Sequence, residues 1–268
     1  MAEISNSQFQ QFRKLIYDKL GISIADHKQQ MIQARLKKVM RDFDISAFDD
    51  LYDRLTKNRN DQYWARFVHE ITTHKTDFFR EYGHFQFIQE KIDFILNLNR
   101  RIERNKEIRV WSAGCSTGEE PYTIAMILKE ALPPDMNIKI LATDISSEVI
   151  DRAQRGVYPP DEEGISEYYI NKYFNKEPDG LHAKKVIKNL ITFRTFNLMS
   201  EFPFKNKFDI IFCRNVMIYF DTAVQEKMIK KYYQFLVPGG LYFIGHSESL
   251  ANKQYKFRYI QPTIYAKS

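Results

Sequence analysis

The first part of the chain, from Ser5 to about Ile71, carries apolar residues three or four positions apart with polar residues between them. Side chains at this spacing share one face of an α-helix, so each group predicts an amphipathic helix. The groups are Phe9, Phe12, Leu15 and Ile16; Met31, Leu36, Val39, Met40 and Phe43; Phe48, Leu51, Tyr52 and Leu55; and Trp64, Phe67, Val68 and Ile71. The pattern predicts a small helical domain, and we expect one further helix from about Thr76 to Arg101.

Beyond the charged stretch RRIERNKEIR, short β-rich segments alternate with helical ones. The expected strands are IRVWSA, IKILATD, LITFRTFN, FDIIFCRN, GLYFIGHS and RYIQPTIYAKS. Helices between strands indicate a parallel sheet covered on both faces, a doubly wound, Rossmann-like α/β fold ending in a C-terminal hairpin. We therefore divide the chain into a helical domain with its linker helix, residues 1–90, and an α/β domain, residues 91–268. The segment of residues 156–190 is longer than a simple crossover between two strands, so it predicts an inserted subdomain.

The turn VWSAGCSTGEEPYTIAM begins like a nucleotide-binding turn but places Glu119 and Glu120 at the start of the following helix. Ser116 with Glu119, or Thr117 with Glu120, has the spacing of a capping box. Carboxylates here would repel a phosphate and attract a cation, while the glycines of the turn let a ligand approach the backbone. The turn therefore favours S-adenosylmethionine, which carries an ammonium, a sulfonium and no phosphate, although a plain capped turn has the same pattern.

Further polar residues follow later predicted strands. Asp144 ends IKILATD, where an acidic side chain can accept hydrogen bonds from both ribose hydroxyls, and Asn215 ends FDIIFCRN. Taken singly, Asp144 is also a suitable helix cap and Asn215 a suitable turn residue. The Pro-Gly-Gly turn at 238–240, between a helix and a late strand, is one that we associate with methyltransferase folds.

Composition and charge indicate the cellular compartment and the kind of partner to expect. The chain of 268 residues carries a net charge of +6, which favours anionic partners. Cys115 and Cys213 are far apart in the sequence, and no His/Cys cluster has metal spacing, so we predict neither a disulfide nor a metal site. The polar N-terminus lacks the apolar segment of a signal peptide and no run is long enough to cross a membrane, so we expect a cytoplasmic protein.

Several blocks together carry a family resemblance. The segments TTHKTDFFRE, WSAGCSTGEEPYTIAM, ATDI, FCRNVMIYFD and LVPGGLYFIGHSESL stand in the order and spacing of the CheR family, the bacterial chemotaxis receptor glutamate methyltransferases, and the match covers nearly the whole chain. The resemblance implies transfer of a methyl group from S-adenosylmethionine to glutamate side chains on the cytoplasmic helices of chemoreceptors. It also implies a monomer that binds no nucleic acid and meets the membrane only through the receptor.

The resemblance also implies which residues form the site. The cofactor contacts carry over to His74, Thr76, Arg80, Glu119, Asp144, Asn197, Leu198, Asn215 and Val216. His74 departs from the family, which usually has Asn at this position. Tyr232 matches a family position near the transferred methyl group and is the expected catalytic residue, although it also fits the apolar face of its helix. The inserted subdomain corresponds to one that grips a receptor tail peptide in some members.

Other functions fit the sequence less well. An NAD-dependent dehydrogenase would need G-x-G-x-x-G and an open helix N-terminus, and GCSTGEE has neither. A nucleic-acid methyltransferase would suit the positive charge, but CRNVMIYF stands where its D/N-P-P-Y motif is expected. A receptor-binding module without activity would not need Glu119, Asp144 and Asn215. The basic residues Lys28, Arg35, Lys37, Lys38 and Arg41 form either a solvated helix face or a surface for acidic receptor helices.

Overall fold

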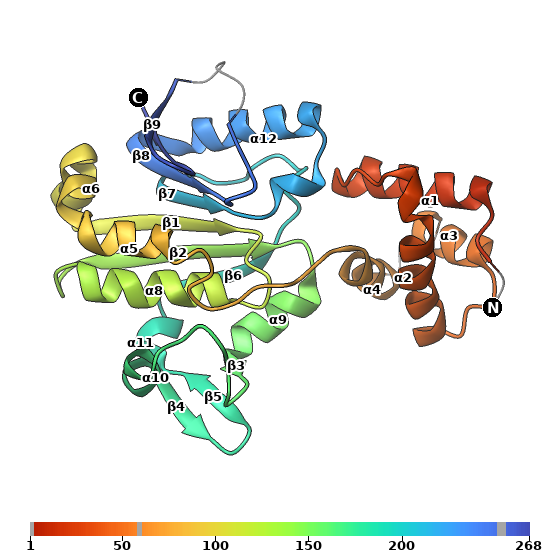
Figure 1. Ribbon diagram of the computed structural model, residues 1–268, viewed down its shortest axis with the longest axis horizontal. Coiled ribbons are helices and arrows are strands. Elements are labelled where there is room, and N and C mark those ends of the chain that lie inside the picture. The colour runs from red at the N-terminus through yellow and green to blue at the C-terminus, as the bar shows by residue number, and fades with distance from the viewer. Residues whose placement is uncertain (1–2, 58–60, 251–255) are drawn as a thin grey trace.

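The computed structural model describes residues 3–57, 61–250 and 256–268 and shows a helical domain beside a larger α/β domain (Figure 1). The helical domain contains α1 (Asn6–Leu20), η1 (Asp26–Lys28), α2 (Gln29–Asp42), α3 (Phe48–Thr56) and α4 (Asp61–Ile71). Its apolar faces meet in one core that includes Phe12, Leu36 and Phe67, all fully buried. The predicted helical domain is confirmed.

The α/β domain is built on a mostly parallel sheet. Within the described residues the strand order is β6-β2-β1-β7-β8-β10-β9, and β10 and β9 are antiparallel. The strands are β1 (Glu107–Ala113), β2 (Asn137–Asp144), β6 (Ile191–Thr195), β7 (Phe208–Cys213), β8 (Leu236–Ile244), β9 (Phe257–Gln261) and β10 (Ile264–Lys267). The Rossmann-like fold with a C-terminal hairpin, predicted from the sequence, is confirmed.

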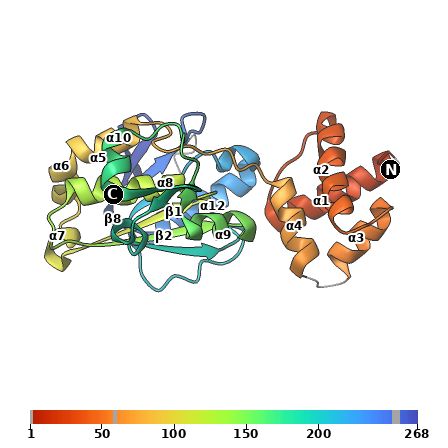
Figure 2. The same ribbon diagram turned by 90° about the horizontal axis from the view of Figure 1, so that it is seen from below.

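Both faces of this sheet are buried, which explains its continuous apolar strands. Alternate residues of a strand enter opposite cores: Ile210 and Phe212 face one, and Ile211 and Cys213 face the other. The main covering helices are α8 (Glu119–Ala131), α9 (Ser147–Arg155) and α12 (Thr222–Phe235). In Figure 2 the sheet and its helices form one body, and the helical domain stands at its side.

The prediction of one helix from about Thr76 to Arg101 is wrong. The chain instead turns at residues 78–82 and then forms α5 (Gly83–Glu90), α6 (Ile92–Leu98) and α7 (Arg101–Asn105). The turn places Phe79 and Glu81 at φ 55° and 57°, in the left-handed region that a helix cannot contain. The domain boundary near residue 90 stays a prediction. Because α5 packs in the core of the sheet domain, the packing favours a boundary nearer residue 72.

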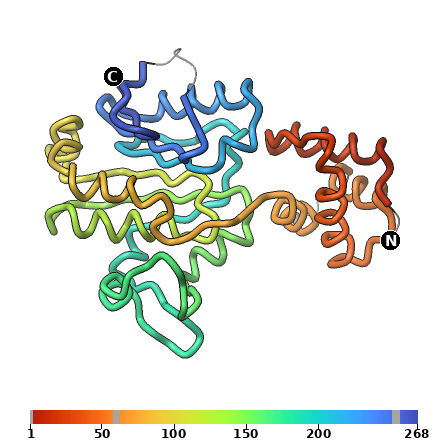
Figure 3. Tube along the Cα trace, viewed as in Figure 1, coloured from red at the N-terminus to blue at the C-terminus, as the bar shows by residue number. Residues whose placement is uncertain are grey.

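Residues 156–190 form the small subdomain that the sequence predicts. It holds a separate antiparallel sheet of order β3-β5-β4 and two short helices. The elements are β3 (Val157–Tyr158), α10 (Glu167–Tyr173), β4 (Phe174–Glu177), β5 (Gly180–Ala183) and α11 (Lys185–Lys188). It projects from the body on the side of α8 and α9 (Figure 3).

The two domains meet at the carboxyl ends of the parallel strands, which point toward the helical domain in Figure 1. Asn197 donates a hydrogen bond to the carbonyl of Lys19 at 2.8 Å, and Ile22 forms a bridge with Phe220. On the other side, Arg66 of α4 lies 3.3 Å from Glu148 of α9. These contacts hold the helical domain against the edge where ligands bind in such sheets.

Candidate cofactor site

A cavity lies at this junction of the two domains. Its walls include Leu20 and Ile22 of the helical domain and the segment 71–77 that connects the domains. The α/β domain contributes the ends of β1, β2 and β7, at the point where the strand order reverses direction. Ligands of open α/β sheets bind at such a point.

Most of the predicted site residues line this cavity. They are His74, Thr76, Arg80, Asp144, Asn197, Leu198, Asn215 and Val216. Glu119 and Tyr232 are not among the lining residues. The cofactor contacts predicted from the sequence did not include Glu120, Arg214 and Tyr219, which also line the cavity, although the Glu120 carboxylate was expected to attract a cation. Arg214 could have been predicted from its position at the end of a strand, next to Asn215. Nothing in the sequence pattern distinguishes Glu120 from Glu119.

The turn after β1 brings the backbone to the cavity wall. Gly114 has φ 86°, and a Cβ atom on it would lie 2.4 Å from Cγ2 of Val216. The amides of Gly114 and Cys115 both donate to the carbonyl of Thr143, which ties this turn to β2. Glycine at 114 is therefore required both by the left-handed backbone and by the approach of Val216.

The capping boxes predicted at this turn are wrong. The N-cap of α8 is Gly118, at φ 102°, and no side chain caps the helix there. Ser116 donates instead to the carbonyl of His74 at 2.8 Å, and Thr117 donates to the Glu119 carboxylate. Because Gly118 is the N-cap, Ser116 and Thr117 precede the position from which a side chain forms a capping box.

Glu119 and Glu120 have different environments. Glu120 accepts from Ser112 Oγ at 2.6 Å and from Arg214 Nη1 at 3.1 Å, and it reaches the cavity. Glu119 is turned toward Thr117, with only 6% of its surface exposed. Burial raises the pKa of Glu119 to about 7, and the Thr117 hydroxyl only partly offsets this. Of the two carboxylates, only that of Glu120 lines the cavity, where it is also paired with Arg214.

Asp144 lies at the end of β2 with both carboxylate oxygens oriented by backbone amides. Oδ2 accepts from Ser116 N at 2.9 Å and Oδ1 from Ser146 N at 3.0 Å. Burial raises the pKa of Asp144, and these amides act in the opposite direction. Each oxygen keeps a further lone pair for a hydroxyl of a bound ligand.

The turn of Asn215 and Val216 is held by a carboxylate. Glu248 accepts hydrogen bonds from the amides of Asn215, Val216 and Met217 at 3.1, 3.0 and 2.8 Å. This arrangement supports the left-handed backbone of Asn215, at φ 56°. Burial raises the pKa of Glu248, whereas the amides favour its charged form. Glu248 therefore positions Asn215 without lining the cavity itself.

Arg214 is the central cation of the site. Its guanidinium donates to Glu81 Oε2 at 3.0 Å and to Glu120 Oε2 at 3.1 Å, and its side chain is 2% exposed. It also donates to the carbonyl of Arg80 and lies 5.3 Å above the ring of Phe85. The turn at 78–82, the start of α8 and the end of β7 are joined through this one side chain.

His74 contributes to the cavity wall, but its ring is engaged within the helical domain. Nε2 lies 3.0 Å from Thr72 Oγ1 and 3.0 Å from the carbonyl of His69, and the two imidazole rings stack at 4.6 Å. The ring thus closes the end of α4 and fixes the chain where it enters the cavity. A contact of His74 with the cofactor stays a prediction.

Tyr232 lies in the core on the opposite side of β7, with no exposed surface, and its hydroxyl is 3.2 Å from Cys213 Sγ. The structure does not bring it to the cavity. Tyr219, in the short helix η2 (Met217–Tyr219), lines the cavity directly after the Asn215 turn. The packing role that the sequence also allowed for Tyr232 agrees with this position, and its catalytic role gains no support from it.

The predicted basic face of α2 is smaller than expected, because Arg35 turns inward. Its Nη1 donates to the carbonyls of Glu70 and Thr72 at 3.1 and 3.0 Å, at the end of α4. A guanidinium at a helix C-terminus satisfies carbonyls that have no partner in the helix. Lys28, Lys38 and Arg41 remain exposed.

The residues present fit S-adenosylmethionine. An acidic side chain ends β2, a carboxylate stands in the first turn of α8, and the glycine turn leaves backbone exposed to the cavity. Together with the sheet order, these features define an S-adenosylmethionine-dependent methyltransferase. Models of the CheR methyltransferase all-alpha domain and of its SAM binding domain match residues 7–72 and 74–266. The chain belongs to the CheR methyltransferase family.

Curated relatives agree with this assignment. A chemotaxis protein methyltransferase of Borreliella burgdorferi is 38% identical, over 99% of this chain and 95% of its own length. Those of Escherichia coli and Salmonella typhimurium are 35% and 37% identical, over 99% of this chain and 92% and 91% of their own lengths. Among the described residues, no helix combines the length and the apolar character needed to cross a membrane.

The burial of Glu119 predicts a pH-dependent stability. Its pKa of about 7 in the folded chain exceeds the ordinary value of 4.5 for a glutamate. The folded state therefore binds the extra proton between these pH values, and stability falls as pH rises from 4.5 to 7. Glu119→Gln removes this loss, and we expect its free energy of unfolding to exceed that of the wild type by up to about 3 kcal/mol at pH 8. Urea unfolding at pH 5 and pH 8 measures the difference.

The exposed Glu163 supplies the control for this measurement. Glu163→Gln should change stability by less than about 0.5 kcal/mol at either pH. A Glu119→Gln variant that is no more stable than the wild type at pH 8 would contradict the buried, partly protonated Glu119.

Proposed function

We propose that this protein transfers the methyl group of S-adenosylmethionine to glutamate side chains of chemoreceptors, forming methyl esters. The observation that carries the proposal is the cavity between the helical domain and the strand ends, with Asp144, Glu120 and Asn215 in its wall. The names of the curated relatives, chemotaxis protein methyltransferases matched over nearly their full length, support the receptor as substrate. As part of the proposal, the enzyme acts in the cytoplasm as a monomer.

The cofactor roles follow from the positions of the polar groups. Asp144 accepts the ribose hydroxyls, because both of its oxygens are held at the cavity by the amides of Ser116 and Ser146. Glu120 attracts the methionine ammonium, since it and not Glu119 reaches the cavity. Asn215 and Val216 contribute their turn, and Asn197, Leu198, Thr76 and Arg80 complete the wall.

The reaction requires little acid–base catalysis by the protein. A glutamate carboxylate is ionised at neutral pH and is already a nucleophile. When bound, the cofactor supplies an electrophilic methyl group: a carboxylate oxygen forms the O–CH3 bond as the S–CH3 bond breaks, and the neutral thioether leaves. The cavity therefore serves to align these atoms and to exclude water, which is worth several kcal/mol of the barrier. No general base is needed.

Arg80 is the cation best placed to guide the incoming glutamate. It lines the cavity, it is partly exposed, and its Nη1 donates only to the nearby carbonyl of Lys75 among the hydrogen bonds described. Arg214, by contrast, is already paired with Glu81 and Glu120. A guanidinium at the entrance can bind a carboxylate with two parallel hydrogen bonds.

The helical domain has a surface suited to an acidic partner. Lys28, Lys38 and Arg41 are exposed on or next to α2. Exposed charges of one sign accelerate encounter with an oppositely charged partner, and salt screens the effect over about 10 Å at 0.1 M. We assign this surface to the glutamate-rich helices of the receptor.

The ester chemistry is tested with labelled S-adenosylmethionine and receptor-containing membranes. We expect label on the receptor that mild base releases as volatile methanol, because carboxyl methyl esters hydrolyse readily. Membranes that lack chemoreceptors are the control. Base-stable label would reject the ester, and transfer to control membranes would reject the receptor as substrate.

Cofactor binding by Asp144 is tested by calorimetry. Asp144→Ala removes a charged acceptor for two hydroxyls, so we expect the affinity for S-adenosylhomocysteine to fall about 10-fold or more. Asp151→Ala, on the exposed face of α9, is the matched control and should bind as the wild type does. An unchanged affinity of Asp144→Ala would remove this residue from the site.

A pair of tyrosine variants separates the sequence assignment from the structural one. Tyr219 lines the cavity, and we assign its hydroxyl to the reacting groups, so Tyr219→Phe should lower kcat about 10-fold or more. Tyr232→Phe, in the core, should keep kcat within about twofold and change mainly stability. Single-turnover methyl transfer measures both. The reverse result would restore the catalytic role predicted for Tyr232.

A further inference from the structure

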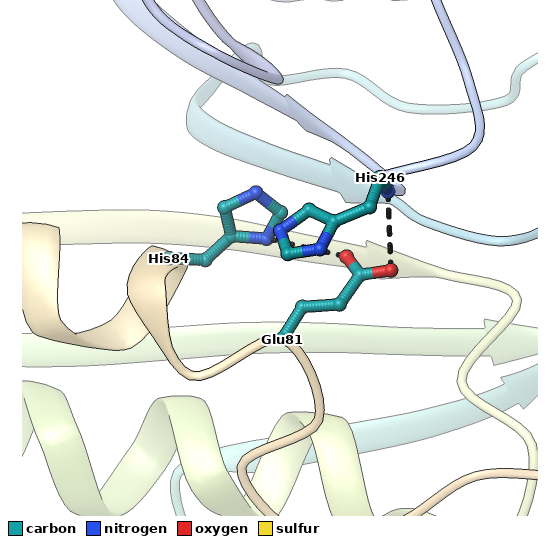
Figure 4. Close-up of side chains that lie close together, drawn as sticks. All are labelled: Glu81, His84 and His246. Carbon is teal, nitrogen blue, oxygen red and sulfur yellow. Dashed lines mark hydrogen bonds and ion pairs between the residues drawn. The ribbon is translucent and has the colours of Figure 1, made fainter.

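Next to the cofactor cavity, three residues from separate parts of the chain bring metal-ligand atoms together (Figure 4). Glu81 lies in the turn before α5, His84 in the first turn of α5, and His246 two residues after the end of β8. One donor atom of each lies within 4.8 Å of the others. The sequence predicted no metal site because His246 is far from the other two along the chain.

His84 carries an unpartnered nitrogen inside this cluster. The residue is 2% exposed, and its Nδ1 has no hydrogen-bond partner. Its Nε2 lies 2.6 Å from Thr263 Oγ1, and that hydroxyl donates its proton to the carbonyl of Pro262. With the hydroxyl donating to Pro262, the matching tautomer carries its proton on Nε2 and a lone pair on Nδ1.

This lone pair faces a second acceptor. Nδ1 lies 3.7 Å from Oε2 of Glu81, a carboxylate that accepts hydrogen bonds from Arg214 and from the amide of His246. Two buried acceptors in this position repel each other unless a cation lies between them.

We propose that Glu81, His84 and His246 bind a divalent transition-metal ion, with zinc as the expected occupant. Two imidazoles and one carboxylate are a zinc donor set, whereas calcium and magnesium prefer oxygen ligands alone. Donors about 2.1 Å from a tetrahedral zinc ion are about 3.4 Å apart, close to the distance between Nδ1 and Oε2. The Nε2 hydrogen bond to Thr263 provides the orienting partner that metal-bound histidines usually have.

His246 supplies the route to solvent. Its side chain is exposed, and its ring centroid lies 5.3 Å from that of His84. Its backbone amide donates to Glu81 Oε1 at 3.1 Å, which holds the residue beside the carboxylate, and we expect rotation of the exposed side chain to bring a ring nitrogen to the metal ion. With three protein ligands, the fourth position remains open to water.

The proposed site is linked to the cofactor cavity through Glu81. Oε2 also accepts from Arg214, and Oε1 accepts from Asn215 Nδ2 at 3.2 Å. A metal ion on Oε2 would compete with the guanidinium for the same oxygen and repel it. Arg214 and Asn215 both line the cavity, so metal binding should weaken cofactor binding, and the cofactor should weaken metal binding by the same factor.

A second cluster in the described chain offers a matched control. Glu177, Asp179 and His182 also bring donor atoms together, but on the exposed rim of the inserted subdomain. There His182 Nε2 already has a partner in Asp179 Oδ1 at 2.7 Å. Replacing His182 should therefore not affect metal binding at His246.

The test titrates the full chain, free of cofactor, with Zn²⁺ by calorimetry and with Co²⁺ by visible absorption. We expect one equivalent to bind, with cobalt bands typical of nitrogen ligation. His246→Ala, an exposed change that leaves the core intact, should weaken binding about 10-fold or more, while His182→Ala should bind as the wild type does. S-adenosylhomocysteine at saturation should weaken Zn²⁺ binding.

Three results would overturn the proposal. They are no binding to the wild type, binding lost in His182→Ala, and unchanged affinity in His246→Ala. Unchanged Zn²⁺ affinity with cofactor bound would reject the coupling through Glu81. Metal binding by the cofactor-free chain depends on neither the methyl acceptor nor the cofactor, so it is independent of the function proposed above. Only the coupling measurement rests on the proposed cofactor binding.

Discussion

The guanidinium of Arg214, held between Glu81 and Glu120, is the interaction on which the site depends. All three side chains are largely buried, so each charge would be costly without the others. The pairing brings the turn before α5 onto the ends of β7 and α8. It explains why the predicted helix from Thr76 breaks at Phe79 and Glu81, since a continuous helix could not carry Glu81 to this position.

Around this centre the cavity is assembled from segments that are distant in sequence. Gly114 and Asp144 mark the ends of β1 and β2, Asn215 follows β7, and the connection from the helical domain closes the remaining side. Glu248 holds the Asn215 turn from outside the cavity. Because both domains contribute to the wall, cofactor binding and the position of the helical domain are expected to affect each other.

The same carboxylate that fixes Arg214 also faces His84 and His246. Because Glu81 contacts both Arg214 and the two histidines, it links the proposed metal site to methyl transfer. A cation on one side of Glu81 and a guanidinium on the other compete for one negative charge, so occupancy of the metal site would act on the cofactor cavity without contact with the cofactor.

The sequence by itself determined the fold class, because the change from helical to strand periodicity, and strands apolar on both faces, follow from local spacing. It also located Asp144 and Asn215, since strand ends in a parallel sheet share one edge. Only the tertiary structure placed Glu120 rather than Glu119, and Tyr219 rather than Tyr232, at the cavity wall, and brought His246 to His84. In each case the outcome depends on the direction of a side chain, which is set by left-handed turns and by packing partners far away in the chain.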